Sequence, residues 1–374
     1  MAKIADAFSI IRNGANIKQG LDDSGYPITR IETISNRTVD RNKMGYAGVT
    51  DISKYFDYVL QNGDILMSHI NSETHLGKVA LYEKQEDETI IHGMNLLCLR
   101  PKKELLDSRY AFYYLSSDAF LRQIPRITKK SVNQASFNVA ALKELTIPIP
   151  EIEKQRDIVR GLDKVSELIA LRKEQIVKLD QLVKSRFIEL FGDYRINEKG
   201  FDCKKGSELF KFSSGKFLPE EKRLDEGIPV YGGNGIAWYT SESLVDYPTI
   251  IIGRVGAQCG NIHAVTTPVW ITDNAIYIKE QKTNAYTLEF LTELMRMMDF
   301  YQYADFSGQP KITQKPLETL NYIMPPIELQ NEYTAFVEQT DKSKLAIQQS
   351  LDKLELLKKS LMQEYFGWKE GYKC

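Results

Sequence analysis

The chain has 374 residues, of which 43% are hydrophobic and 26% are charged, and its formal net charge is −1 at pH 7. This length suggests two or three domains, and the composition is that of an ordinary soluble protein. No apolar run approaches membrane-spanning length and the first residues lack a signal-peptide pattern, so we expect no membrane association. Because nucleic-acid-binding proteins are usually basic, such a role would require local positive patches or a basic partner.

The four cysteines are scattered along the chain without a C-x-x-C pair; they are Cys98, Cys203, Cys259 and Cys374. This spacing argues against a disulfide framework and against a zinc module. It fits a reducing compartment, so we predict a cytoplasmic location.

Residues 1–149 are predicted to form a first domain of mixed strands and helices. Short apolar runs at 64–67, 79–82 and 96–99 are bounded by Gly, Asn and Asp, as is typical of strands. Residues 109–124 carry apolar side chains at helical spacing, which predicts one amphipathic helix. Basic residues suited to phosphates and amides suited to adenine then follow, although a solvated surface explains the basic ones equally well. The candidate DNA contacts of this domain are Arg126, Lys129, Lys130, Asn133 and Gln134.

Residues 150–192 and 325–374 contain two copies of one stretch. Pro150 aligns with Pro325, and the same offset of 175 residues continues to the Phe-Gly that ends each copy, which indicates an internal duplication. An initial proline, a glutamate in the first turn and a final glycine predict one long helix per copy, on the order of 60 Å.

Apolar residues recur every seven positions in both copies, as in a coiled coil. They are Leu162, Ile169, Ile176, Val183 and Leu190 in the first copy and Ile347, Leu354, Leu361 and Trp368 in the second. We predict that the two helices pack on each other as an antiparallel coiled coil and act as a spacer. The alternative is that each helix covers the core of its own domain.

Residues 193–324 repeat the plan of the first domain in outline. The echoes are Gly227–Val230 with Gly25–Ile28, Thr249–Arg254 with Asp64–His69, Gly260–Val265 with Gly77–Leu81, and Ser307–Lys311 with Val132–Ser136. The chain is therefore predicted to be an α+β protein in which two mixed α/β domains alternate with two repeated helices around an approximate two-fold repeat. That geometry suits the reading of two different half-sites on one duplex.

The second domain offers a glycine-rich loop and an isolated arginine as DNA contacts. In the loop, glycines allow close backbone approach, Asn234 suits a base edge, and Tyr231 and Trp238 can stack or pack. Arg254 follows an apolar strand and could reach guanine or a phosphate. Gln309, matched to Gln134, and Lys311 complete the set. A plain turn is the alternative for the loop, and a salt bridge is the alternative for the arginine.

Catalytic signatures are missing from the sequence. We find no phosphate-binding loop, no H-E-x-x-H and no G-x-S-x-G. Asp273 with Glu280 and Lys282 resembles the acidic pair and lysine of metal-dependent nucleases. The same stretch fits better as a turn into a strand that ends in a charged run, so we expect neither catalytic residues nor a metal site.

The full chain resembles the specificity subunit of a type I restriction-modification system. Besides the order of domains and helices, the resemblance is carried by four stretches: Ile147-Pro-Ile-Pro150 through Gln155, Ile323-Met-Pro-Pro326 through Gln330, Tyr231-Gly-Gly, and Thr249–Arg254. The first domain departs from the second, since it has His69 in place of Arg254 and no Tyr-Gly-Gly loop.

The resemblance implies a subunit without catalysis of its own. Each target-recognition domain would read one half of a bipartite site in double-stranded DNA, and the helices would set the spacing and dock two methyltransferase subunits. An ATP-dependent restriction subunit would join them, and S-adenosylmethionine, ATP and magnesium would be bound by these partners rather than by this chain. The alternatives are a single-chain metal-dependent nuclease and a coiled-coil scaffold without sequence-specific DNA binding.

Overall fold

The computed structural model describes residues 1–17, 24–34, 37–130 and 134–367. The chain divides into two compact units. Unit 1 comprises Met1–Leu171 with Leu351–Cys374, and unit 2 comprises Arg172–Ser350. Each unit therefore contains one domain and a part of each long helix.

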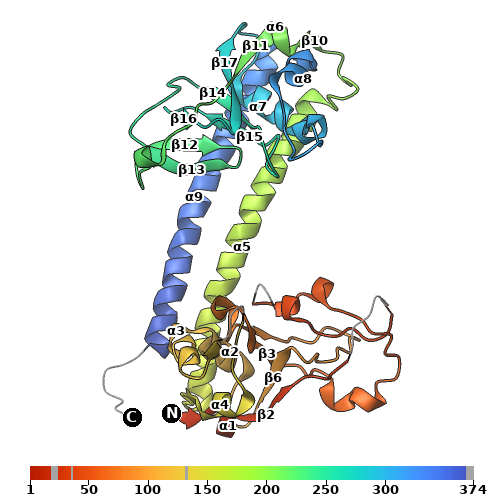
Figure 1. Cartoon of the computed structure of the whole chain (residues 1–374), viewed down its shortest axis with the longest axis vertical. Coiled ribbons are helices and arrows are strands. Elements are labelled where there is room, and N and C mark those ends of the chain that lie inside the picture. The colour runs from red at the N-terminus through yellow and green to blue at the C-terminus, as the bar shows by residue number, and fades with distance from the viewer. Residues whose placement is uncertain (18–23, 35–36, 131–133, 368–374) are drawn as a thin grey trace. The chain divides into compact units, whose positions relative to one another are not determined.

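The domain of unit 1 is built on a four-stranded antiparallel sheet (Figure 1). Across the sheet the strands are β2 (Phe8–Asn13), β6 (Leu96–Pro101), β3 (Ile65–Ser68) and β5 (Val79–Leu81). Side chains alternate between two cores, because Ile65 and Met67 of β3 pack into the main core while Leu66 packs with Tyr82 behind the sheet. The strands predicted at 64–67, 79–82 and 96–99 are confirmed.

The helix predicted over residues 109–124 is interrupted. The structure has α2 (Ser108–Ser116), α3 (Asp118–Leu121) and a 3-10 turn at Ile124–Arg126. At Ser117 the backbone is extended, and the hydroxyl donates to the Tyr114 carbonyl (2.6 Å) and accepts from the Phe120 amide (3.4 Å). Serine favours such a cap over a helix interior, so the apolar spacing continues through a break in the backbone.

Short elements complete unit 1. They are β1 (Ala2–Lys3), α1 (Ile4–Ala7), β4 (Ile70–Asn71), β7 (Lys129–Lys130), β8 (Ala135–Ser136), α4 (Val139–Glu144), β9 (Thr146–Ile147) and 3-10 turns at Ile31–Ile34, Arg41–Lys43, Ser53–Tyr58 and Glu73–His75.

Unit 2 has a four-stranded antiparallel sheet with the strand order β11 (Phe210–Ser214), β17 (Ala275–Gln281), β14 (Thr249–Gly253), β15 (Ile262–Val265). A second sheet has the order β13 (Gly235–Thr240), β12 (Ile228–Gly232), β16 (Trp270–Ile271). The helix α7 (Leu288–Met297) packs on one face of the larger sheet, where it shares a core with Ile250 and Ile276. The remaining elements are β10 (Asp202–Lys205), α6 (Gly206–Leu209), α8 (Gln314–Thr319), β18 (Asn321–Met324) and 3-10 turns at Glu220–Lys222 and Phe300–Tyr303.

The two domains share one backbone plan. In unit 1 the Gly77 amide donates to the Ser68 carbonyl (2.9 Å), and in unit 2 the Gly260 amide donates to the Gly253 carbonyl (2.8 Å), at the same place between paired strands. Ile28 forms a parallel bridge with Ile91, just as β12 pairs in parallel with β16. The internal repeat predicted for the domains is thus present in the backbone hydrogen bonds.

The two long helices have equal length: α5 is Ile152–Phe191 and α9 is Ile327–Phe366, each of 40 residues. In unit 1 the start of α5 and the end of α9 lie at the same domain (Figure 1), and they share one core in which Leu162 and Phe366 are buried. In unit 2 the end of α5 meets the start of α9, since Phe187 packs on Tyr333 and Asp180 pairs with Lys344 (2.6 Å). The helices therefore pack antiparallel in each unit, as predicted; Trp368 lies outside the described residues.

Each helix is joined to the domain that precedes it by a buried glutamine. Gln155 donates to the Leu105 and Pro150 carbonyls (3.0 and 2.8 Å) and accepts from the Asp107 amide (2.9 Å). Gln330, 175 residues later, makes the same three bonds to Ala285, Pro325 and Thr287. Neither glutamine has any exposed surface. The pattern shows that the duplication includes the joint between domain and helix.

Across the described residues, no helix has the length and apolar character needed to cross a membrane.

Candidate nucleic-acid interface

Arg254 is held at the surface where the buried strand β14 ends. Its amide donates to the Asn274 carbonyl and its carbonyl accepts from the Ile312 amide, both at 2.9 Å, so the backbone is fixed on two sides. Within the described part of the chain, the guanidinium donates one hydrogen bond, to the Asp273 backbone carbonyl at 3.4 Å. Among the residues that the structure describes, no carboxylate forms an ion pair with it. The salt bridge considered as the alternative for Arg254 is therefore not formed.

The glycine-rich loop is a β-hairpin of β12 and β13 with Gly233 and Asn234 at its turn. A Cβ on Gly253 would lie 2.8 Å from the Gly233 carbonyl oxygen, so only glycine at the end of β14 lets the hairpin approach so closely. The Tyr231 ring lies 5.9 Å from the ring of His263 on β15, and Asn234 is exposed. The structure thus places Tyr231 and Asn234 on the same side of unit 2 as Arg254.

Trp238 has a neighbour that the sequence argument missed. The Arg223 guanidinium lies 4.1 Å from the centre of the indole ring, in a cation–π contact, and also pairs with Glu220 at 3.3 Å. A base therefore has no access to that face of Trp238. Arg223, and not the covered face of Trp238, is therefore the group that is exposed to a ligand. No local sequence motif predicts this role for Arg223, because its contact with Trp238 depends on how the β12–β13 hairpin folds.

Gln309 and Lys311 belong to a loop that lies against the end of β14. The loop is closed by two backbone hydrogen bonds between Asp305 and Lys311, of 2.9 and 3.1 Å. Its Pro310 carbonyl accepts from the Gly256 amide at 2.9 Å, and Lys311 bridges Val255. Residues from three separate stretches of sequence, 231–234, 254–256 and 305–311, therefore converge on one surface of unit 2.

Unit 1 repeats this arrangement with other side chains. The Phe137 amide donates to the His69 carbonyl (3.1 Å), the counterpart of the Ile312 bond to Arg254. In unit 1, Ser136 pairs with Ile70 and with Lys129 in the sheet β4-β8-β7, just as Lys311 of unit 2 pairs with Val255 and with Asp305. Gln134 precedes β8 as Gln309 precedes Lys311. Asn133 lies outside the described residues.

The basic candidates of unit 1 are exposed, but one already has a partner. Lys130 pairs with Glu73 at 2.7 Å, with both side chains more than half exposed. Arg126 and Lys129 are exposed nearby. His69 is buried, and burial lowers the pKa of its imidazole, so it supplies no positive charge at the position where unit 2 has Arg254.

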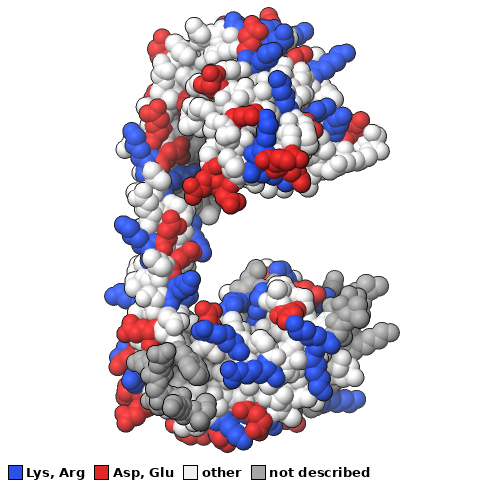
Figure 2. Space-filling view, turned by 60° about the vertical axis from the view of Figure 1, so that its left-hand side comes forward, with Lys and Arg blue, Asp and Glu red and all other residues white. Residues whose placement is uncertain are grey.

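Charge is distributed differently on the faces of the two units seen in Figure 2. On unit 1, the lower body in that view, Lys and Arg side chains gather with few Asp or Glu among them. On unit 2 the two signs are mixed. A local positive patch, one of the two ways in which a chain of net charge −1 could bind DNA, is therefore present on the visible face of unit 1.

The counterpart of the glycine-rich hairpin in unit 1 is a longer connection. Ile28 bridges Gly45 in antiparallel fashion, as the equivalent Val230 of β12 pairs with Trp238 of β13, so residues 29–44 stand where unit 2 has only residues 231–237. The connection carries Arg30, Arg37, Arg41 and Lys43, of which Arg41 pairs with Glu88 at 2.7 Å. The sequence similarity between Gly25–Ile28 and Gly227–Val230 could have indicated where this connection begins.

The nuclease-like residues do not form a metal site. Asp273 precedes β17, whereas Glu280 lies near its other end and pairs with Lys211 across the sheet. At about 3.3 Å per residue, the strand separates the two carboxylates by roughly 20 Å, too far for one ion. Lys282 donates to the Ser207 carbonyl at 2.7 Å. No group of His, Cys, Asp or Glu among the described residues could hold a metal ion.

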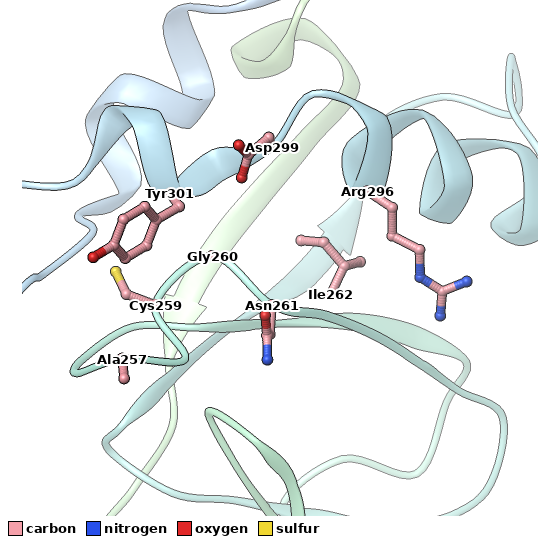
Figure 3. Close-up of a pocket in the computed structure, with 8 residues that line it drawn as sticks. All are labelled: Ala257, Cys259, Gly260, Asn261, Ile262, Arg296, Asp299 and Tyr301. Atoms are coloured by element: carbon pink, nitrogen blue, oxygen red, sulfur yellow. The ribbon is translucent and has the colours of Figure 1, made fainter. Parts of the chain in front are cut away.

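A pocket of about 310 Å³ lies between the loop after β14 and the segment after α7. Cys259 and Tyr301 stand at one end and Arg296 at the other, with Asp299 as its single carboxylate (Figure 3). The Cys259 thiol donates to the Arg254 carbonyl (3.3 Å), and burial raises its pKa, so it is not a reactive thiolate at neutral pH. No paired nucleophile and base line this pocket.

Comparisons with known proteins agree with the fold. The family model described as "Type I restriction modification DNA specificity domain" matches residues 1–181 and 198–357. The type I restriction enzyme MjaX specificity subunit of Methanocaldococcus jannaschii is 32% identical over 96% of this chain and 91% of its own length. The EcoprrI specificity subunit of Escherichia coli is 27% identical over 68% of this chain and 67% of its own.

The crystal structure of a type I restriction-modification S subunit from M. genitalium has the same fold, with a TM-score of 0.63 at 19% identity over 98% of this chain and 96% of that one. Two matched domain repeats, two long helices and a relative similar along nearly its whole length leave one assignment. The chain belongs to the type I restriction-modification DNA specificity subunits, the non-catalytic component of these systems, and has two recognition domains.

Proposed function

We propose that the chain reads a bipartite site in double-stranded DNA, one half with each recognition domain. The observation that carries this proposal is one backbone plan with two sets of side chains. His69 stands where Arg254 stands, Ser136 where Lys311 stands, and the connection 29–44 where unit 2 has the shorter connection 231–237. Equivalent positions with different donors and acceptors suit two different half-site sequences.

The residues proposed to contact DNA are those exposed or partly exposed around the ends of β14 and β3. In unit 2 these are Tyr231, Asn234, Arg254, Gln309 and Lys311, with Arg223 in place of the covered face of Trp238. In unit 1 they are Arg126, Lys129, Lys130 and Gln134, together with the predicted Asn133. Cationic groups among them would hold phosphates, and amides would read base edges.

The helices are proposed to set the gap between the half-sites and to dock two methyltransferase subunits, which a restriction subunit would join. Several apolar side chains remain exposed on them, as is common at protein–protein interfaces. They are Leu168, Leu171, Val177, Leu182 and Ile188 on α5 and Leu345, Leu356 and Leu357 on α9. Partner subunits that enclose the DNA would supply the electrostatic attraction to phosphates that a chain of net charge −1 lacks.

In this assignment S-adenosylmethionine, ATP and magnesium belong to the partner subunits, and the complex works in the cytoplasm. In the described part of the chain, one cysteine is exposed and two are buried, and none of the three forms a disulfide. This suits a reducing compartment.

Genome-wide detection of methylated adenine tests the proposal, in cells that carry the methyltransferase partner with and without this gene. We expect a motif of two parts, separated by a fixed gap, that disappears with the gene. A variant with a stop codon before α5 controls for effects of the locus itself. Methylation that is unchanged by removal of the gene, with the partner expressed, would contradict the proposed function.

A further inference from the structure

We propose that residues 305–311 of unit 2 form a preformed recognition tip, in which Phe306 and Gln309 read A·T base pairs within the half-site of that domain. This inference rests on the proposed function and deepens it, because it names the bases and adds Phe306 to the contacting residues.

The backbone of the recognition tip is fixed before any ligand binds. Asp305 and Lys311 exchange both backbone hydrogen bonds, and the Asp305 carboxylate accepts from the Ser307 amide at 2.8 Å. The Pro310 carbonyl is tied to the Gly256 amide at 2.9 Å. A loop closed at its base and along one side loses little conformational entropy on binding, which favours affinity and a single register.

Phe306 is an exposed aromatic residue that packs on a second aromatic ring. Just over half of its surface (54%) is accessible, although a phenyl ring gains nothing from contact with water. Its ring packs edge-on against Tyr301 at 5.3 Å, and Tyr301 is itself placed as one wall of the pocket in Figure 3. The ring is thus in contact with the protein on one side and exposed on the other, where it could meet apolar base features.

Gln309 presents an exposed side-chain amide. Its Nε2 lies 3.1 Å from the place where a Cβ on Gly256 would be, so the side chain rests over that glycine. Gly256 has a φ of +85°, a conformation that favours glycine, and any larger residue would push the amide away. Within the described residues, no hydrogen bond from the Gln309 amide to the protein is found. Its donor and acceptor are therefore available together.

The two side chains point to the same base pair type by different chemistry. A free glutamine amide matches N6 and N7 of adenine in the major groove, and an apolar ring matches the C5 methyl of thymine. The neighbouring charges balance, since the tip contains both Lys311 and Asp305. Hydrogen bonds from the Ser307 backbone and hydroxyl, and then the charge of Lys311, hold the pKa of Asp305 below its usual value. The tip is thus suited to base edges more than to phosphates.

The test is selection of bound DNA by the complex of this chain with its methyltransferase partner, from a pool of duplexes of random sequence. We compare the wild type with F306A and Q309A, and use Q302A as the matched control. Gln302 is exposed in the same region but donates to the Met298 carbonyl at 2.7 Å and lies outside the tip. Thermal unfolding of each variant checks that it is folded.

We expect F306A and Q309A each to lose about tenfold or more of the preference for A·T at one or two positions of the second half-site. The first half-site, the gap and the motif of Q302A should stay as in the wild type. An unchanged motif in both variants, an equal loss of affinity for all sequences, or a loss confined to G·C positions would each overturn the proposal. A wild-type complex that selects no motif would instead overturn the proposed function itself.

Q309E provides a second variant that changes the preference without shortening the side chain. A carboxylate accepts from N4 of cytosine and repels N7 of adenine, so the selected base at the Gln309 position should change from adenine to cytosine. Retention of adenine by a folded Q309E complex would show that Gln309 does not contact that base.

Discussion

At the residue level, the partners that a side chain already has decide what it can offer to DNA. Lys130 is paired with Glu73 at 2.7 Å, and Arg223 covers Trp238, whereas the partner of the Arg254 guanidinium among the described residues is a backbone carbonyl at 3.4 Å. A guanidinium with unused donors can form a bidentate contact with guanine, which an occupied one does only after losing its partner. Arg254 is therefore the strongest guanine-reading candidate of the second domain.

Replacing Arg254 with alanine should weaken binding through the second half-site. A lost bidentate contact costs about 1–3 kcal/mol, or roughly a factor of 5 to 150 in affinity. The measurement is the affinity of the complex for a duplex with the intact site and for one with a scrambled second half. R195A is the control, because Arg195 is an exposed arginine of the same unit that is paired with Asp193 at 2.6 Å.

The scrambled duplex separates the two roles that Arg254 could have. If it reads a base, R254A lowers the affinity for the intact site and leaves the affinity for the scrambled duplex nearly unchanged. An equal loss on both duplexes would mean that Arg254 contacts only a phosphate.

The sequence was sufficient to single out Arg254, because it directly follows an apolar strand and precedes glycine-rich sequence. It was not sufficient to show that Lys130 has a partner. Glu73 lies far away along the chain, and only the pairing of β4 with β8 and of β8 with β7 brings it within reach of Lys130. Likewise, burial of His69 against Phe137 depends on tertiary packing that no local pattern records.

At the level of elements, each long helix carries in its first turn a buried glutamine whose amide is fully hydrogen-bonded. Gln155 bonds three backbone groups, two in the loop before α2 and one just before α5. Buried backbone groups left without hydrogen bonds cost about 1–3 kcal/mol each. The duplicated glutamine therefore stabilises the joint between domain and helix in both units.

Q155L should lower the unfolding midpoint of the protein and speed hydrogen exchange in the segment around Asp107, because leucine fills the space but bonds none of the three groups. Mass spectrometry of exchange and thermal unfolding measure these effects. Q175L is the control, since Gln175 is exposed on the same helix and accepts only from Arg172 (2.7 Å); a surface change of this kind stays within about 0.5 kcal/mol. Equal behaviour of Q155L and Q175L would show that the buried bonds add no stability.

The repeated helices could be predicted from sequence because proline, a seven-residue apolar period and Phe-Gly all act locally. The break at Ser117 could not, since the apolar spacing of residues 109–124 continues across it while the backbone becomes extended. The similarity of Gly25–Ile28 to Gly227–Val230 was visible in the sequence, but the length of the connection that follows Ile28, residues 29–44, was not. Loop length there is set by what the loop contacts and not by the strands that it joins.

At the level of the whole molecule, the proposed function implies that the length of the helices sets the gap between the two half-sites. In each unit the two helices pack antiparallel, so a change in one repeat must be matched in the other for the apolar seam to stay in register. Removal of one heptad from the same place in both, residues 172–178 and 347–353, keeps that seven-residue period. It shortens each helix by about 10 Å, close to the rise of three base pairs.

We expect this paired deletion to retain both half-site sequences and to select a gap that is shorter by about three base pairs, at the rise per pair of duplex DNA. Deletion from one helix alone breaks the register of the seam and should abolish assembly. The measurement is the methylated-adenine motif in cells, with selection from random duplexes for the purified complex. An unchanged gap would show that the helices do not set the spacing. A changed half-site sequence would mean that they also shape the surfaces that read DNA.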